Sequence, residues 1–370
     1  MAEQRARGGK ARIEKVQVSS GFLVVIGAST GGITALMEIA AALPARFPAP
    51  VCIVQHVGNH PSLLPELLSR SGPNPAKHAR DGEPLAPGML YVAPPDHHLL
   101  VEEGGMRIAR GPKENHTRPA IDPLFRSAAA SWGPGAIGVV LTGQLDDGTA
   151  GLRAIKECGG VAVVQDPNEA VEPDMPLSAL RSVAVDHCMP VRAIAQLLVE
   201  LVAHATPARA PPVPARIARE TAIHRGDMAM DNLQALADPS PLTCPDCGGS
   251  LWEMRGEYPP RYRCHIGHGY TAATLESAQL ESADYAVQTT VRALRERELL
   301  LRRLAGIADA TGDTAQAGAG RAEADRLRRR IDELRSIGEA GGNGANGANG
   351  ANGALRRFGR AAPHHPKGKR

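Results

Sequence analysis

Short apolar runs alternate with longer amphipathic stretches over about half of this 370-residue chain. Between Gly21 and Ala205 the runs are rich in β-branched residues and apolar throughout, and Ala- and Leu-rich stretches separate them. Strands that are apolar on both faces and are joined by helices form parallel sheets with helices on both sides. The pattern therefore predicts an α/β domain with a doubly wound, mainly parallel sheet over residues 21–205. Six runs carry this prediction: FLVVIGA, VCIVQHV, MLYVAP, AIGVVLTG, VAVVQD and VAVDHCM.

The rest of the chain changes composition from segment to segment. A basic leader covers residues 1–20, and a Pro- and Ala-rich linker is expected over residues 206–240. A Cys-rich module follows over residues 241–273. Leucine and isoleucine at heptad-like spacing among many Arg and Glu predict a helical hairpin or coiled coil over residues 274–338. The Gly/Asn/Ala repeats and basic residues of 339–370 predict a disordered tail.

Composition excludes several classes of protein. The longest apolar runs are too short to span a bilayer, and the apolar stretch behind the leader ends in Gly-Ala-Ser-Thr-Gly-Gly, too early for an export signal. We therefore expect a soluble, cytoplasmic protein. The formal net charge of +3 indicates no class of partner. Of the six cysteines, Cys52, Cys158 and Cys188 lie scattered among apolar segments and are predicted to be buried thiols.

Three predicted strands end beside a reactive residue. Ser29 follows FLVVIGA, His56 follows VCIVQ, and Asp147 follows AIGVVLTG after a short loop. Because the carboxyl ends of parallel strands meet at one edge of a sheet, we expect these side chains to lie close together. A hydroxyl, an imidazole and a carboxylate are the groups of Ser-His-Asp catalysis, in which the imidazole removes the serine proton and the carboxylate orients the ring. The sequence thus predicts a serine nucleophile.

The turn GASTG at residues 27–31 permits two interpretations. It satisfies the pattern G-x-S-x-G of a turn that exposes a serine between a strand and a helix. A similar turn binds phosphate through free backbone amides. The phosphate interpretation lacks its other parts, because no Lys-Ser/Thr pair follows and the second strand ends in Gln55-His56, not in an acidic residue that would hold a ribose. The order Ser, His, Asp also differs from that of α/β-hydrolases.

The Cys-rich module has the spacing of a metal site. Cys244-x-x-Cys247 is followed after sixteen residues by Cys264-x-x-x-His268, which suits one tetrahedral zinc. His265 is the competing ligand, but adjacent residues point apart, which favours His268. Four protein ligands leave no open position, so the zinc would be structural rather than catalytic. Buried thiols without metal are the alternative.

Six stretches occur in order along the first two hundred residues: IGASTGG, VQHV, YVAPPDHHLLVEEGGMRIARGP, N-x-x-RPAIDPLFRSAA, LTGQLDDGTAGLRAIKECGGVAVVQDP and MPLSAL. Together they resemble the catalytic domain of CheB, the chemotaxis protein-glutamate methylesterase family, over about residues 21–200. The resemblance implies hydrolysis of glutamate γ-methyl esters on the cytoplasmic helices of chemoreceptors, often with deamidation of receptor glutamines. It also implies that catalysis needs no cofactor.

The resemblance assigns roles to individual positions. Ser29 matches the nucleophile and His56 the base of the family. Asp147 matches the acid within the family's Asn-Asp-Gly, and Asp146 is the alternative for that role. Backbone N–H groups near Thr30 and at Gln144 match the oxyanion hole. The other matched polar residues, Asn115, Arg118 and Asp122, are expected to fix loops.

The chain departs from the family in two places. Residues 143–145 read Gly-Gln-Leu where the family reads Gly-Met-Gly, which alters the loop of the expected oxyanion hole. Only about twenty residues precede the first strand, so no phosphorylated receiver domain is expected there. Activity would then be constitutive, or controlled by a partner or by the C-terminal part. A Cys-rich block followed by a long helix also resembles C-terminal extensions of receiver-less relatives.

Two classes of function remain open. The leading one is a serine hydrolase acting on methylated receptors in chemotaxis or a chemosensory-like pathway. The other is a non-catalytic regulatory or scaffolding protein with the same fold, whose module and helices bind a sensory kinase or receptor. Nucleic-acid binding has little support, because acidic residues offset the arginines of the module and no basic face results.

Overall fold

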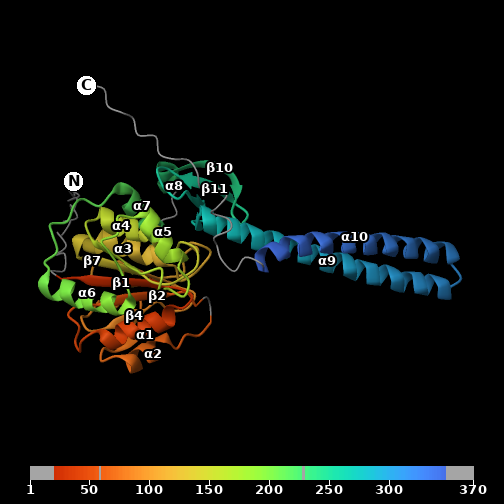
Figure 1. The fold of residues 1–370 in the computed structure, drawn as a ribbon. Coiled ribbons are helices and arrows are strands. Elements are labelled where there is room, and N and C mark those ends of the chain that lie inside the picture. Colours follow the sequence, from red (N-terminus) through yellow and green to blue (C-terminus); the bar gives the residue numbers. More distant parts are fainter. Residues whose placement is uncertain (1–20, 58–59, 227–229, 347–370) are drawn as a thin grey trace, which may run out of the picture. The chain divides into compact units, whose positions relative to one another are not determined.

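The computed structural model describes residues 21–57, 60–226 and 230–346 (Figure 1). The predicted leader and the end of the predicted tail, residues 347–370, lie outside the described residues. The chain divides into two compact units with the boundary between Leu275 and Glu276. None of the described helices is both long and apolar enough to cross a membrane.

The first unit contains a seven-stranded sheet in which every pairing is parallel, in the order β3-β4-β2-β1-β7-β8-β9. Successive residues of β1 are all buried, since the sheet is covered on both faces. The order reverses at β1, which pairs with β2 on one side and β7 on the other. The strands are β1 (Leu23–Ala28), β2 (Val51–Gln55), β3 (Ala76–His78), β4 (Leu90–Val92), β7 (Ala136–Val140), β8 (Val161–Gln165) and β9 (His187–Met189).

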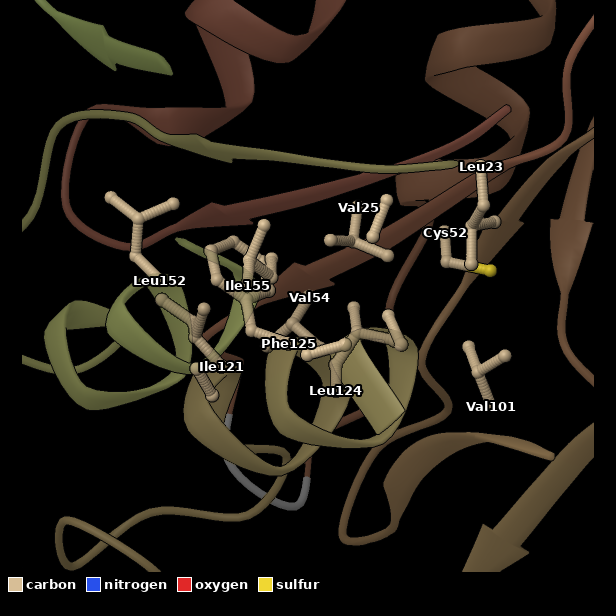
Figure 2. Close-up of a cluster of buried hydrophobic side chains, with 14 of the residues drawn as sticks. Leu23, Val25, Cys52, Val54, Val101, Ile121, Leu124, Phe125, Leu152 and Ile155 are labelled. Carbon is tan, nitrogen blue, oxygen red and sulfur yellow. The ribbon is translucent and has the colours of Figure 1, made fainter. Parts of the chain in front are cut away.

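Helices cover both faces of the sheet, as a doubly wound fold requires. Alternate residues of β1 enter different cores: Val24 packs with α1, α2 and α6, whereas Val25 packs with α3, α4 and α5. Figure 1 shows α1 and α2 on one side of the sheet and α3 and α4 on the other. In Figure 2, Val25 and Val54 of the sheet face Leu124 and Phe125 of α3. The helices are α1 (Gly32–Ala42), α2 (Leu64–Ser71), α3 (Ile121–Trp132), α4 (Thr149–Glu157), α5 (Asp174–Ser182) and α6 (Val191–His204).

Two shorter features complete this domain. An antiparallel hairpin, β5 (His98–Glu102) and β6 (Gly105–Ala109), precedes α3 in the chain. A 3-10 turn, Gly133–Gly135, follows α3. The prediction that the scattered cysteines are all buried is wrong for Cys188, which is exposed. Its strand, β9, is an edge strand of the sheet and so leaves one side uncovered.

The predicted linker over residues 206–240 is wrong for most of its length. It contains α7 (Ala215–His224) and α8 (Met230–Leu236), and β10 (Ala237–Thr243) begins the next sheet. Ile217, Thr221 and His224 recur with helical spacing and are buried, so α7 packs against α3. Tertiary burial of one face therefore makes a helix out of a segment whose composition suggested a linker.

The Cys-rich module folds as an antiparallel sheet in the order β10-β11-β12-β13, with β11 at Ser250–Met254, β12 at Arg261–Cys264 and β13 at Gly269–Thr271. Helix α9 (Ala272–Ala310) follows it, and α10 (Thr314–Asn346) lies beyond a turn at Gly312, whose φ of 81° suits glycine. In the second unit, an Arg302–Asp325 ion pair joins these helices. Helix α10 continues past residue 338 into the predicted tail, since no proline interrupts its hydrogen bonds there.

Candidate active site

The three residues predicted at the rim of the sheet lie together. Ser29 follows β1, His56 follows β2, and Asp147 lies in the loop between β7 and α4, and β1 is the neighbour of both other strands. His56 Nδ1 lies 3.1 Å from Ser29 Oγ, and His56 Nε2 lies 2.8 Å from Asp147 Oδ2. The parallel sheet thus brings a hydroxyl, an imidazole and a carboxylate into one hydrogen-bonded chain.

The turn at Ser29 is fixed by backbone contacts and by its glycines. The Ser29 N–H donates to the carbonyl of Thr142 at 2.9 Å, and the Gln55 amide donates to the Ser29 carbonyl at 2.8 Å. Gly31 has a φ of 79°, which residues with a side chain rarely adopt. A Cβ on Gly143, in the facing loop, would lie only 2.7 Å from Ser29 Cβ. Close approach of two loops therefore holds the serine at the start of α1.

Asp147 is a buried carboxylate surrounded by donors. Its Oδ2 accepts from His56 Nε2 and from the Ile121 N–H at 2.7 Å, and its Oδ1 accepts from the Gly148 N–H at 2.9 Å. Burial alone would raise the pKa of Asp147, but the hydrogen bond and charge of His56 and the neighbouring donors hold it below its usual range. Asp147 is therefore ionised when it contacts His56.

Two residues that the sequence interpretation assigned to loop fixing contact this carboxylate, Asn115 through its side chain and Asp122 through its backbone N–H at 3.2 Å. Asn115 Nδ2 donates to Asp147 Oδ1 at 2.7 Å and to Asp122 Oδ2 at 2.9 Å. Burial raises the pKa of Asp122 to about 7, and the charge of Asp147 adds to the shift. Arg118 lies elsewhere, paired with Asp96. A buried carboxylate needs donors, and that requirement was the available signal for Asn115.

Asp146, the alternative for the acid, faces away from the imidazole. Its Oδ1 accepts a hydrogen bond from the Thr271 hydroxyl of β13 at 2.8 Å. Its side chain is buried, and no contact joins it to His56 among the described residues. Adjacent positions in the loop therefore have different partners, and Asp147 is the one that orients the ring.

Asp146→Asn is expected to stabilise the folded chain above about pH 6. Burial raises the pKa of Asp146 from 3.8 to about 6, although the hydrogen bond from Thr271 opposes the shift. Between these two pKa values the folded state keeps a proton that the unfolded chain loses. The free energy of unfolding therefore falls by roughly 3 kcal/mol as the pH rises from below the lower pKa to above the higher one. Asparagine keeps the acceptor and has no charge to bury. Urea unfolding at pH 4 and pH 8 measures the gain, and equal gains at both pH values would contradict the expectation.

The predicted oxyanion residues lie at the two exposed loops beside Ser29. Thr30 and Gln144 are exposed, and within the described chain neither backbone N–H donates to another residue. A pocket of about 360 Å³ opens here, lined among others by Thr30, Thr34 and His56; Gln144 is not part of its described lining. Leu145 has a φ of 62°, so the loop keeps a left-handed backbone at the position where the family pattern has glycine.

The predicted metal ligands also lie together. The ligand atoms of Cys244, Cys247, Cys264 and His268 are all within 4.8 Å of one another. Cys247 Sγ lies 3.8 Å from Cys264 Sγ, and His268 Nδ1 lies 3.5 Å from Cys264 Sγ. A tetrahedral zinc with Zn–S bonds of about 2.3 Å needs ligand separations of roughly 3.5–3.8 Å. His265 is not a member of the cluster. The four donor atoms of the cluster fit zinc in both their identity and their spacing.

Comparisons with known proteins match the domain that carries Ser29. The family described as CheB methylesterase matches residues 24–198. A relative from Leptospira interrogans is 41% identical over 184 residues, which are 48% of this chain and 93% of that protein. A relative from Anaeromyxobacter dehalogenans is 38% identical over 199 residues, 54% of this chain and 57% of that protein. Both descriptions name protein-glutamate methylesterase and protein-glutamine glutaminase.

One solved structure is also similar. The CheB methylesterase catalytic domain of Thermotoga maritima is 37% identical and aligns with a TM-score of 0.48 over 50% of this chain and all of that one.

Proposed function

The chain belongs to the CheB methylesterase family, and on this premise we propose that it is a serine hydrolase acting on chemoreceptors. It removes methyl groups from glutamate γ-methyl esters of these methyl-accepting proteins, in chemotaxis or a related chemosensory pathway. The names of its relatives add hydrolysis of protein glutamine side chains. The observation that carries the proposal is the contact of His56 with both Ser29 and Asp147.

The first half-reaction, acylation of Ser29, depends on which nitrogen of the His56 ring carries the proton. Ionised Asp147 accepts a hydrogen bond from the Nε2–H group, so Nδ1 presents its lone pair to the Ser29 hydroxyl. The two ring nitrogens thus exchange the roles that they have in chymotrypsin-type proteases. His56 takes the hydroxyl proton as Ser29 Oγ attacks the γ-carbonyl carbon. The imidazolium then gives this proton to the methoxide, and methanol leaves the acyl-enzyme.

Deacylation reverses the roles. His56 removes a proton from water as the oxygen attacks the acyl carbon, and gives it to Ser29 Oγ as the bond to the acyl carbon breaks. The glutamate leaves as a carboxylic acid, which then releases its proton to solvent. With a glutamine side chain as substrate the leaving group is ammonia. We propose that the N–H groups of Thr30 and Gln144 donate to the oxyanion, a role that their lack of other acceptors supports.

Ser29→Ala is expected to abolish methanol release from methylated receptor, because Ser29 Oγ is the hydroxyl that contacts His56 and forms the acyl ester. Methanol is measured with membranes that contain radiomethylated receptor. A fluorophosphonate should label the native chain at Ser29 and leave the variant unlabelled. Equal circular dichroism and melting temperatures of the two proteins serve as the control. Wild-type turnover by the variant would overturn the proposal, and a native chain that is neither labelled nor active would favour the scaffolding function instead.

Further elements of the proposal concern the rest of the chain. We propose that Cys244, Cys247, Cys264 and His268 bind one structural zinc, which supplies no chemistry to the ester hydrolysis. The separations of their donor atoms support this assignment. The partners are methylated receptor helices, and a sensory kinase or a receiver protein in trans is the proposed regulator. Because these partners act at the inner side of the cell membrane, the proposed location is the cytoplasm.

A further inference from the structure

The loop that carries Asn115 is a tight turn with an unfavourable backbone. The Glu114 N–H donates to the Thr117 carbonyl at 3.3 Å, and the Thr117 N–H donates to the Glu114 carbonyl at 3.1 Å. Asn115 and His116 have φ values of 53° and 60°, so both central residues are left-handed. Asparagine tolerates the left-handed region, but two successive residues with side chains hold positive φ angles at some cost, which surrounding contacts offset. The turn at residues 113–117 therefore needs support from outside.

That support comes from the Cys-rich module. The Asn115 N–H donates to the carbonyl of Gly269 at 2.7 Å, and the Gly269 N–H donates to the carbonyl of Lys113 at 3.1 Å. Gly269 directly follows His268, and Asp246 lies between Cys244 and Cys247. Asp246 carboxylate oxygens lie 3.5 Å from Lys113 Nζ and from His116 Nδ1. The segments that contain the proposed zinc ligands thus pair with the turn directly.

Buried charges add a second attachment. The Glu114 carboxylate, almost completely inaccessible, accepts from Arg126 of α3 at 2.7 Å. It also accepts from two arginines of β12, Arg261 at 2.9 Å and Arg263 at 3.1 Å. Separating such a pair would leave charges buried without a partner. The module is therefore attached to Glu114, the residue before Asn115, by buried ion pairs. Loss of any one of them would destabilise the folded chain.

We infer that the Cys-rich module positions the catalytic carboxylate: by pairing with the turn at residues 113–117 it holds Asn115, and Asn115 holds Asp147 in line with His56. The inference rests on the proposed function. Asn115 is then a positioning residue. Full activity at Ser29 requires the metal-loaded module, although the module contributes no reacting group to the site.

Asn115→Gly tests the last link of this chain. Glycine adopts the positive φ freely, so the turn and its pairing with Gly269 should persist while the donor to Asp147 is lost. We expect kcat for ester hydrolysis, and the rate at which a fluorophosphonate labels Ser29, to fall about tenfold, as for loss of one charge-assisted hydrogen bond. KM should change less than twofold. His116→Gly, which keeps this donor and loses the contact with Asp246, should label within about threefold of the wild-type rate.

Cys247→Ser in the full chain tests the link to the module. We expect loss of bound zinc by metal analysis, faster hydrogen exchange of the Asn115 amide, and about tenfold slower labelling of Ser29. In the Asn115→Gly background the same substitution should change labelling less than twofold, because the signal passes through Asn115. If Cys247→Ser does not fold, Asp246→Asn replaces it, with ligands intact and a smaller drop of about threefold expected.

Three results would overturn the inference. One is wild-type labelling by Cys247→Ser after its zinc is lost. Another is a Cys247→Ser and Asn115→Gly double variant whose labelling rate falls by the product of the two single-variant factors. The third is normal kcat in Asn115→Gly. In each case Ser29 is still labelled in the native chain, whereas failure of the proposed function leaves the native chain itself unlabelled.

Discussion

Asp147→Asn is expected to lower kcat by about 10⁴-fold while KM changes little. Both oxygens of the native carboxylate accept hydrogen bonds. Oδ1 faces the Asn115 amide and two backbone N–H groups, and Oδ2 faces His56 and the Ile121 N–H. An asparagine must place its NH₂ group against one of these sets of donors.

The orientation of the asparagine amide decides how much kcat falls. Oδ1 faces two backbone N–H groups, which cannot reverse, whereas Oδ2 faces one backbone N–H group and His56, whose ring can shift its proton, so the NH₂ group is better placed at Oδ2. There it donates to His56 Nε2, which moves the imidazole proton to Nδ1 and toward Ser29. The ring then has no lone pair for the serine proton. The NH₂ group also faces the Ile121 N–H, which loses its acceptor, so the variant loses the base together with one hydrogen bond of the site.

Asp146→Asn is the matched control for this prediction. It makes the same chemical change one residue earlier, where the side chain accepts from Thr271 and from no other side chain in the described part of the chain. Its kcat should stay within about threefold of wild type. Steady-state methanol release from methylated receptor measures both variants. A large loss with Asp146→Asn and a small one with Asp147→Asn would exchange the roles of the two aspartates.

Glu220→Gln is expected to destabilise the first unit by about 3–5 kcal/mol, the usual loss when one partner of a buried ion cluster is removed. Glu220 is fully buried in α7. Burial opposes its charge, yet the charges of Arg126, Arg261 and Arg263 hold its pKa well below the usual range. Its carboxylate lies 2.8 Å from Arg261 and 3.3 Å from Arg263. The variant leaves Arg126, Arg261 and Arg263 to share the carboxylate of Glu114, with Glu257 4.0 Å from Arg261.

Thermal unfolding of the full chain measures this effect, and Tm should fall by roughly 10 °C. Asp238→Asn is the control, because Asp238 forms a similar two-bonded pair with Arg255 on the exposed side of β10. Solvent screens that pair, so its Tm should hardly change. A Glu220→Gln chain that melts with the control would show that the buried cluster contributes little to the attachment of α7 and β12.

Local pattern was sufficient for several features. The apolar runs of β1, β2 and β7 predicted a sheet covered on both faces, and the reactive residues after those runs predicted one site at its edge. The Cys-x-x-Cys and Cys-x-x-x-His spacing likewise predicted the cluster at Cys244. The periodicity of each run and the Cys/His spacing are visible without the fold. Ser29, His56 and Asp147 are far apart in sequence, but each follows a strand of a parallel sheet, and the ends of such strands meet at one edge.

Tertiary structure decided which side chains meet across long separations. Asn115 and Asp147 are 32 positions apart, and Glu114 and Arg261 are 147 apart, so no local pattern links them. The helix at Ala215–His224 forms because one face is buried, although its surroundings read as a linker. The sequence by itself determined the parallel sheet, the reactive groups at its edge and the Cys/His cluster. The sequence interpretation also favoured Asp147 over Asp146, and the fold places Asp147 against His56. Only the fold decided that the module meets the turn at Asn115, because that contact depends on groups brought together by packing rather than by sequence.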